Sequence, residues 1–281
     1  MILVTTPNGK VGSAVVKQLV AQGAPLRVGA PTVAKAQAAF PGVDVARFDF
    51  ADEDSVQAAL AGVDTLYLAS PGDMLAEPIK RVVDLARSHG VERIVRLSAL
   101  GVEQGESPLR EVERHIEGSG LVWTLLRPNF FMQNYSTINA ASIRDEGAIY
   151  EPAEDAKTSF VDARDIAAVA VKALTEDGHA GKAYAITGGR VYDRQEVAAA
   201  ISEVIGKEVR YVPTTDEQLR AAMVGAAPHF IDLMSTLYQG VRAGWTATVT
   251  DTVERVTGRA PYTIEQFARD YSAVWLGATN T

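Results

Sequence analysis

The stretch of the sequence best suited to chemistry is a glycine-containing turn, Thr6-Pro7-Asn8-Gly9-Lys10-Val11-Gly12, between a short apolar run and an amphipathic stretch. Where a strand leads through a tight turn into a helix, the first amides of the helix are free to bind an anion. The helix dipole favours a negative charge at the same place. Gly9 would let the backbone approach a pyrophosphate, and Gly12 would let the helix pack against the strand. We therefore expect phosphate binding here, with a purely structural tight turn as the alternative.

Two positions depart from a standard dinucleotide-binding pattern. Thr6 stands where the first glycine is expected, and a β-branched residue tolerates a positive φ badly, so the turn either uses another conformation or is strained. Pro31 follows the second predicted strand, where a carboxylate would hold a ribose hydroxyl or an arginine a 2′-phosphate. Arg27 and Lys35 could reach a phosphate only indirectly. The sequence gives NADP a slight preference over NAD and leaves open whether a dinucleotide binds at all.

The composition excludes several classes of protein. The chain has 281 residues, of which 47% are hydrophobic and 22% charged, as in ordinary globular proteins. It has no cysteine, and its four histidines lack metal-ligand spacing, so we expect a reducing compartment and no metal. The net charge of −8 disfavours a nucleic-acid partner. No apolar run approaches the length of about 18 residues that a membrane span needs. We expect a cytoplasmic monomer or homodimer that acts on a small molecule.

The elements that would position the turn follow a regular alternation. Short apolar runs alternate with stretches of helical period through the first two thirds of the chain, which is typical of βαβ units around a parallel sheet. The predicted strands are Ile2–Thr5, Leu26–Ala30, Val43–Phe48, Thr65–Ala69, Arg93–Ser98 and Val122–Arg127. The pattern predicts a Rossmann-like, doubly wound α/β fold with its ligand crevice outside the carboxyl ends of the strands.

The pattern changes near residue 135. A loop-rich stretch leads to a predicted helix, Ile166–Leu174, and a predicted strand, Ala183–Thr187, before a capping box formed by Asp193 and Glu196. We predict a dinucleotide-binding core over residues 1–134. Residues 135–281 would form a smaller α/β substrate lobe that is interwoven with the core, with residues 159–187 rejoining it.

Several short motifs occur in a characteristic order along the chain. They are Asp49-Phe50, Ala61-Gly62-Val63-Asp64, Ser70-Pro71, Leu97-Ser98-Ala99-Leu100-Gly101, Thr124-Leu125-Leu126-Arg127-Pro128, Phe130-Phe131-Met132-Gln133-Asn134 and Ser159-Phe160-Val161-Asp162. Together with the glycine turn, they resemble the NmrA-like group of atypical short-chain dehydrogenases/reductases over nearly the whole chain. That group includes NAD(P)H:quinone oxidoreductases, a triphenylmethane reductase and non-catalytic NAD(P) sensors.

The resemblance implies a specific cofactor site. At the pyrophosphate turn its members are Thr6, Asn8, Gly9, Lys10 and Val11. The adenine would be bordered by Asp49 and Phe50, and the nicotinamide ribose by Ala69, Ser70 and Pro71. The nicotinamide would be flanked by Ser98 and Ala99. Asp49 could instead be a helix cap or a loop acid, and Ser98 an ordinary strand-end hydroxyl.

The larger family uses a tyrosine, and a lysine four residues later, as its proton relay. Matching the corresponding helix here puts Gly105 and Leu109 at those positions, and none of the nine tyrosines has lysine four residues on. The usual general acid is therefore missing. The catalytic residues stay unknown, with Ser98 and Tyr135 as weak candidates.

The same predicted helix carries two charged residues beside its apolar stripe. Leu109, Val112 and Ile116 define the stripe. Glu113 and Arg114 lie off it, so we expect both side chains to be solvated.

A mixed aromatic and polar segment follows the sixth predicted strand. Its members, with one aromatic residue from further along the chain, are Asn129, Phe131, Asn134, Tyr135 and Phe160. Such a mixture suits a planar ligand, although an aromatic stripe is more often part of a core. We take these residues as the predicted substrate pocket.

Three functions remain open from the sequence. An electrophilic acceptor, such as a quinone or a delocalised cation, can take a hydride without a strong general acid, so we first expect an NAD(P)H-dependent reductase of conjugated planar compounds. The missing relay also allows a non-catalytic NAD(P) sensor. The departures at Thr6 and Pro31 allow a cofactor-free isomerase, cyclase or lyase on a degenerate fold.

Overall fold

The alternating apolar runs form one seven-stranded parallel sheet in a computed structural model that describes residues 1–71 and 75–277. The strands are β1 (Ile2–Thr5), β2 (Leu26–Ala30), β3 (Asp44–Arg47), β4 (Thr65–Leu68), β5 (Arg93–Leu97), β6 (Val122–Pro128) and β8 (Lys182–Ile186). Their order is β3-β2-β1-β4-β5-β6-β8. The predicted Rossmann-like, doubly wound α/β fold is therefore confirmed, and the predicted strands differ from the observed ones by no more than a residue or two at their ends.

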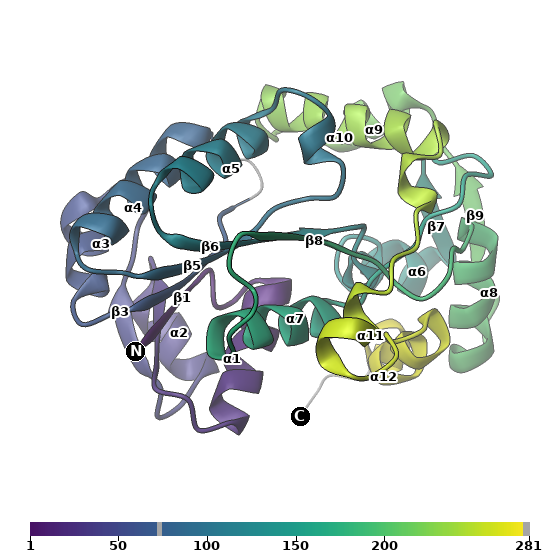
Figure 1. The fold of residues 1–281 in the computed structure, drawn as a ribbon. Helices are drawn as coiled ribbons and strands as arrows, with labels where there is room; N and C mark the ends of the chain where they lie inside the picture. Colours follow the sequence, from purple (N-terminus) through teal and green to yellow (C-terminus); the bar gives the residue numbers. More distant parts are fainter. Residues whose placement is uncertain (72–74, 278–281) are drawn as a thin grey trace. The chain divides into compact units, whose positions relative to one another are not determined.

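Helices cover both faces of this sheet. They are α1 (Lys10–Ala21), α2 (Val33–Ala39), α3 (Glu53–Leu60), α4 (Ala76–Ser88), α5 (Pro108–Gly118) and α7 (Ala163–Thr175), with a short 3₁₀ turn, η1 (Val102–Gln104), before α5. α3 contacts α4, and α4 contacts α5, whereas α1 contacts α7. Figure 1 shows α3, α4 and α5 on one side of the sheet and α1 and α7 on the other. The central strands β1 and β4 are therefore buried along their whole length, which explains their apolar runs, whereas the edge strand β3 is partly exposed.

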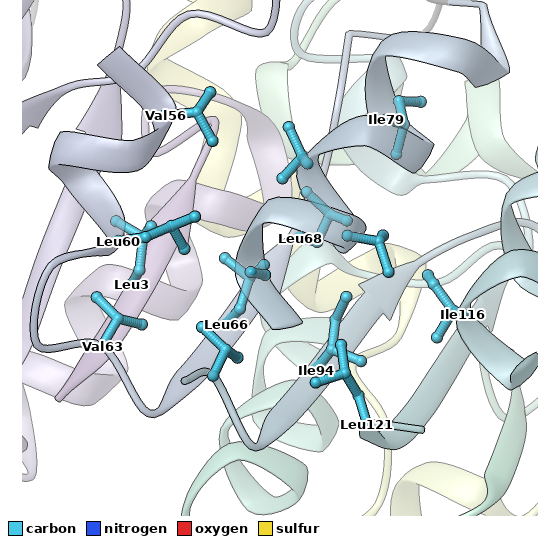
Figure 2. Close-up of a cluster of buried hydrophobic side chains, with 14 of the residues drawn as sticks. Leu3, Val56, Leu60, Val63, Leu66, Leu68, Ile79, Ile94, Ile116 and Leu121 are labelled. Carbon is cyan, nitrogen blue, oxygen red and sulfur yellow. The ribbon is translucent and has the colours of Figure 1, made fainter. Parts of the chain in front are cut away.

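One hydrophobic core lies between the sheet and helices α3, α4 and α5. Alternate strand residues face it, among them Leu3, Leu66 and Ile94, because successive side chains of a strand point to opposite faces. Val56 and Ile116 reach the same core from α3 and α5, as Figure 2 shows. This core fixes the register of the strands and, with it, the level at which each strand ends.

The strand order creates a switch point beside β1. The chain runs outward from β1 through β2 to β3 and then returns to β4 on the other side of β1. Ligands of such sheets bind outside the carboxyl ends of the strands at this point. The residues that follow β1 and β4 are thus placed for ligand binding.

The chain divides into two units by contact. Unit 1 comprises residues 1–128, 163–186 and 255–258, and unit 2 comprises residues 129–162, 187–254 and 259–281, described here as far as residue 277. Unit 2 contains η2 (Met132–Asn134), α6 (Ala140–Glu146), β7 (Ala148–Glu151), α8 (Arg194–Ile205), β9 (Arg210–Pro213), α9 (Asp216–Ala222), α10 (Pro228–Arg242), η3 (Trp245–Ala247) and α12 (Ile264–Leu276). α11 (Thr252–Thr257) runs from one unit into the other.

Unit 2 is organised around α8, α12 and a short parallel pair of strands. β7 pairs with β9, and α8 packs on α12. The predicted capping box is confirmed at the start of α8, where the Asp193 carboxylate accepts from the Glu196 amide at 2.8 Å. The indole of Trp275, buried in the core of this unit, donates to the Tyr135 carbonyl at 2.9 Å. Within residues 1–71 and 75–277, no helix is long and apolar enough to cross a membrane.

Candidate cofactor site

The glycine turn after β1 is closed by its own backbone. The Gly9 amide donates to the Thr6 carbonyl at 3.0 Å, and Thr6 adopts a φ of 48°. Of the two possibilities left by the sequence, the strained one is therefore correct, since a β-branched residue occupies the left-handed region. A Cβ added at Gly12 would lie 2.2 Å from the Thr6 carbonyl oxygen, so α1 can pass this close to the turn only with glycine there.

The start of α1 suits an anion. Gly9 caps the helix in an extended conformation and has no side chain that could accept from the first amides, and the first turn contains no acidic residue. Helix amides at this end have no partner within the helix. Lys10 adds a cation to the same turn, where burial lowers the pKa of its amine. The residues of this turn fit the pyrophosphate of a dinucleotide.

A buried hydroxyl fixes the ends of β1 and β4 at the switch point. Thr5 is fully buried, and its Oγ1 donates to the Ala69 carbonyl at 2.7 Å and accepts from the Ala69 amide at 2.9 Å. These two side-chain bonds connect β1 to the chain just after β4, beyond the last paired residues of the two strands. Ala69, one of the predicted cofactor residues, is thereby held at a fixed distance from the glycine turn.

The ends of β2 and β3 contain a charge that the sequence analysis missed. Arg47 is in register with Ala30, the last residue of β2, and so lies at the carboxyl edge of the sheet. Its guanidinium pairs with Asp52, lies 3.9 Å from Asp49, and holds the pKa of Asp52 below its ordinary value. Asp49 accepts from the Ala51 amide at 3.0 Å, so its observed contact is that of a loop acid. The register of two predicted neighbouring strands was the signal that could have revealed Arg47.

A buried cation lies at the ends of β4 and β5. Arg96 is 2% exposed, and its two terminal nitrogens donate to the Leu68 carbonyl and to Ser70 Oγ, each at 3.1 Å. Burial lowers the pKa of Arg96 to about 10, so the guanidinium remains protonated near neutral pH. The sequence analysis missed this role, although a charge two residues after Ile94 in a buried strand indicates that a partner is needed.

The surroundings of Glu113 differ from those expected from the sequence. It is fully buried rather than solvated, and Arg127 on β6 donates to both of its carboxylate oxygens, at 3.0 and 2.7 Å. Arg110 donates to the same carboxylate at 3.0 Å. Although burial raises the pKa of Glu113, these bonds and the nearby Ser98 hydroxyl hold it below its ordinary value. The sequence pattern identified the apolar stripe of α5 but not the basic partner on β6.

Three further residues singled out in the sequence lie on α5 or before it. Arg114 is exposed, as expected, and pairs with Glu106 at 2.7 Å. Gly105, the position matched to the family tyrosine, is exposed and precedes α5 rather than lying on it. Ser98 follows β5, and its hydroxyl is buried without a well-formed hydrogen bond among the described residues.

The residues predicted for the substrate pocket all belong to unit 2. Asn129 is buried, and its side-chain NH₂ donates to Ser159 Oγ and to the Thr246 carbonyl, both at 2.8 Å. The rings of Tyr135 and Phe160 are buried and meet edge to face, with centroids 5.4 Å apart. Phe131 and Asn134 are half-buried. Three of the five thus have structural roles inside this unit.

Unit 2 also contains a buried ion pair that the sequence analysis missed. Arg194 Nε donates to Glu151 at 2.9 Å, and Nη1 donates to Thr158 Oγ1 at 2.8 Å and to the Ala156 carbonyl at 3.1 Å. Asn139 donates to the other Glu151 oxygen at 3.0 Å. Both charges are therefore held by several partners. Among residues 1–71 and 75–277, no group of three or more acidic or histidine side chains could hold a metal ion.

A family model described as NAD(P)H-binding matches residues 7–177, which include the turn, β4, β5 and α5. The chain belongs to this NAD(P)H-binding family. An NAD(P)H azoreductase from Xenophilus azovorans is 36% identical to it over 99% of this chain and all of the relative.

Two solved structures share the fold of this NAD(P)H-binding protein. An NADPH-dependent quinone oxidoreductase from Escherichia coli, solved with NADPH, has a TM-score of 0.83 and 27% identity, covering 95% of this chain and 98% of the other. A triphenylmethane reductase from Citrobacter sp., solved with NADP(H), has a TM-score of 0.81 and 25% identity, covering 96% and 99%. These relatives confirm the resemblance to the NmrA-like atypical short-chain reductases.

Proposed function

We propose that this protein is an NAD(P)H-dependent reductase of quinone-like or other conjugated planar compounds. The observation that carries the proposal is the match of the NAD(P)H-binding family over a turn whose geometry suits a pyrophosphate. The relatives named above act, by their names, on azo compounds, quinones and triphenylmethane dyes, which are all conjugated acceptors.

The chain's own residues would act by positioning. NAD(P)H, when bound, supplies a hydride. The amides at the start of α1 and Lys10 hold the pyrophosphate, Asp49 and Phe50 border the adenine, and Ala69 is fixed by Thr5 beside the ribose. Conjugated electrophiles need little protonation during the transfer, so the absence of a tyrosine and lysine at Gly105 and Leu109 is compatible with this chemistry.

We further propose that the acceptor is contacted by the half-buried members of the predicted pocket, Phe131 and Asn134. Tyr135 is a poorer candidate for direct contact because its side chain is fully buried, and this burial raises the pKa of its phenol well above the ordinary value.

NADPH is proposed as the preferred cofactor. Ala30, Pro31 and Thr32 offer no carboxylate for the ribose hydroxyls of NADH, and Arg47 stands at the adjacent strand end. The ratio of kcat/KM for NADPH to that for NADH should exceed one and fall in Arg47→Gln. An unchanged ratio would remove Arg47 from the proposal.

The proposed reductase activity is tested by measuring oxidation of NADPH in the presence of an acceptor. The purified protein is mixed with NADPH and, separately, a quinone, an azo dye and a cationic dye, and oxidation of the cofactor is followed by its absorbance. We expect turnover with at least one acceptor. Tight cofactor binding without turnover on any of them would favour the second candidate, a non-catalytic NAD(P) sensor, which the missing relay supports. The match of the NAD(P)H-binding family over residues 7–177 speaks against the cofactor-free alternative.

A further inference from the structure

Trp245 differs from the other two tryptophans of the chain in its exposure. Trp275 is fully buried in the core of unit 2, and Trp123 packs against the core of unit 1. Trp245, on η3, is 65% exposed. Single apolar side chains are often exposed in soluble proteins, so exposure alone does not indicate a ligand. The indole of Trp245, however, is held in place by several specific contacts.

The indole rests on a glycine of α10. A Cβ added at Gly240 would lie 2.6 Å from Cε3 of the Trp245 ring and 3.2 Å from Cζ3, so the ring packs here against a residue without a side chain. Gly240 lies within α10, where glycine lowers helix stability relative to alanine. Gly244, the residue before Trp245, adopts the left-handed conformation at the start of η3, which contacts α10. Two glycines thus place the indole against the helix and leave most of it exposed.

The residues after Trp245 fix this turn. The carbonyl oxygen of the buried Thr246 accepts from Asn129 Nδ2 at 2.8 Å and from the Ser159 amide at 2.9 Å. Ser159 Oγ donates to the Thr248 carbonyl at 2.5 Å. Asn129 and Ser159 are themselves buried, so the turn is held from the interior of unit 2. A surface that is fixed before binding loses little conformational entropy when a ligand stacks on it.

The same turn is tied to the residues that follow two strands of the sheet. Asn129 directly follows β6 in the chain. Thr187 directly follows β8, and its Oγ1 accepts from the Thr250 amide at 2.9 Å. Parallel α/β sheets bind their ligands beyond the carboxyl ends of their strands. The segment that contains Trp245 is thus anchored to the chain that leaves these ends, and Phe131, proposed above as an acceptor contact, comes two residues after Asn129.

The chain around Trp245 is uncharged. Besides the tryptophan, residues 243–250 contain only alanine, glycine, threonine and valine. The guanidinium of Arg242 is engaged elsewhere, with the Pro152 carbonyl at 2.5 Å and with Asp216 at 2.8 Å. An indole attracts aromatic rings and cations. The net charge of −8 also favours a cation. These features favour a planar aromatic ligand, and a cationic one over an anionic one.

The size of this surface distinguishes a small molecule from a protein partner. A tryptophan side chain offers at most about 250 Å². Within residues 243–250, Val249 is the one other exposed large apolar residue. A stable protein interface buries about 800 Å² on each partner. The surface therefore fits one aromatic ring system and is too small for a second copy of this chain.

We propose that Trp245 is the stacking platform for the planar acceptor. This inference rests on the proposed function and names a specificity-determining residue for it. The acceptor lies against the exposed indole, and a delocalised cation binds more tightly than an anion of the same size. Trp245 supplies binding and takes no part in hydride transfer, so its loss affects the KM for the acceptor more than kcat.

The experiment first measures binding without turnover. The protein is saturated with NADP⁺, which has no hydride to transfer, and two dyes with three fused rings each are titrated by calorimetry. They are methylene blue, a cation, and anthraquinone-2-sulfonate, an anion. Trp245→Ala should weaken binding of methylene blue about tenfold and of the anion about threefold, and Trp245→Phe should weaken methylene blue about threefold. Ile138→Ala is the matched control, since Ile138 in unit 2 is 69% exposed, and should change neither affinity.

Gly240→Ala provides an independent test. Its added methyl group displaces the indole, so it should weaken methylene blue about tenfold in the wild type and have no further effect in Trp245→Ala. Thermal unfolding reports whether each variant folds. With NADPH in place of NADP⁺, Trp245→Ala should raise the KM for methylene blue about tenfold with little change in kcat and in the affinity for NADPH. A merely structural role would not separate these quantities.

Each outcome is decisive. Unchanged affinity for methylene blue in Trp245→Ala overturns the inference, as does an effect of Gly240→Ala that persists in Trp245→Ala, or a wild type that binds neither dye. A wild type that sediments as a dimer, with a monomeric Trp245→Ala, overturns it in favour of an interface between copies. Dye binding that depends on Trp245, without oxidation of NADPH by any acceptor, overturns the proposed function instead.

Discussion

Among residues 1–71 and 75–277, each unit contains one fully buried arginine, and the two arginines differ in the partners that surround their charge. Arg194 in unit 2 pairs with Glu151 and makes further bonds to Thr158 and the Ala156 carbonyl. Arg96 in unit 1 donates to the Leu68 carbonyl and to Ser70 Oγ, and the charge of Glu113 favours its protonated form.

The difference separates a charge with a buried anionic partner from a charge with neutral hydrogen-bond partners. A buried cation is expensive unless it is paired, and the Arg194 pair stays within the interior of its unit. Arg96 donates instead to a hydroxyl just beyond the carboxyl end of β4. We infer that the Arg194 pair stabilises unit 2 more than the bonds of Arg96 stabilise unit 1. The following variants test this contrast, from the largest expected effect to the smallest.

Arg194→Met should cause the largest loss of stability. It leaves Glu151 buried with Asn139 as its remaining side-chain donor, and an uncompensated buried charge costs about 3–5 kcal/mol. Urea unfolding measures the free energy of unfolding. Arg81→Met, which breaks an exposed pair with Glu53, is the control and should have little effect. A loss no larger than that of the control would show that the Arg194 pair contributes nothing to unit 2.

Glu113→Gln should cost about 2–3 kcal/mol at neutral pH, because bonds to charged arginines are weakened. The wild-type carboxylate has a lowered pKa in the folded state, so its contribution is complete above the unfolded pKa and is lost as pH falls through the folded value. The difference between wild type and variant should therefore shrink as pH is lowered from about 5 to about 3. A difference that grows over this range would contradict the ionised carboxylate.

Arg96→Met should cost about 1–3 kcal/mol, less than Arg194→Met, because it strands only neutral acceptors, Leu68 O and Ser70 Oγ. The same urea titration compares the two variants. A loss equal to that of Arg194→Met would indicate that Arg96 is paired with a buried anion, and the contrast between the two arginines would disappear.

Thr6→Gly should have the smallest effect, a gain of about 1 kcal/mol or less. Glycine relieves the left-handed strain at a φ of 48°, while its extra freedom in the unfolded chain offsets part of the gain. The melting temperature and the affinity for NADPH are both measured. A loss of stability would mean that the threonine side chain makes contacts that outweigh the strain.

Structural elements that follow from a periodic hydrophobic pattern or from a short local motif could be predicted from the sequence. The strands of unit 1 have apolar runs bounded by glycines, and the turn at Gly9 and the capping box at Asp193 depend on residues within a few positions of one another. The conformation of Thr6 could be reduced to two possibilities but not decided, because the strain depends on how closely α1 approaches the turn at Gly12.

The buried charges could not be predicted in the same way. Glu113 looked solvated because its partner, Arg127, lies on a different element, and hydropathy along one helix does not reveal a partner across the sheet. Arg194 and Glu151 are likewise distant in sequence. Pairing of this kind depends on which elements meet, which only the fold determines.

The most direct test of hydride transfer without a proton relay follows the transferred hydrogen. The protein is mixed in a single turnover with NADPH deuterated at the nicotinamide C4, on one face or the other, and with a delocalised cationic dye that is reduced at carbon. We predict that the reduced dye carries the deuterium from one face only, as mass spectrometry would show. Reduced dye that contains only hydrogen from solvent, or no oxidation of the bound cofactor, would contradict it.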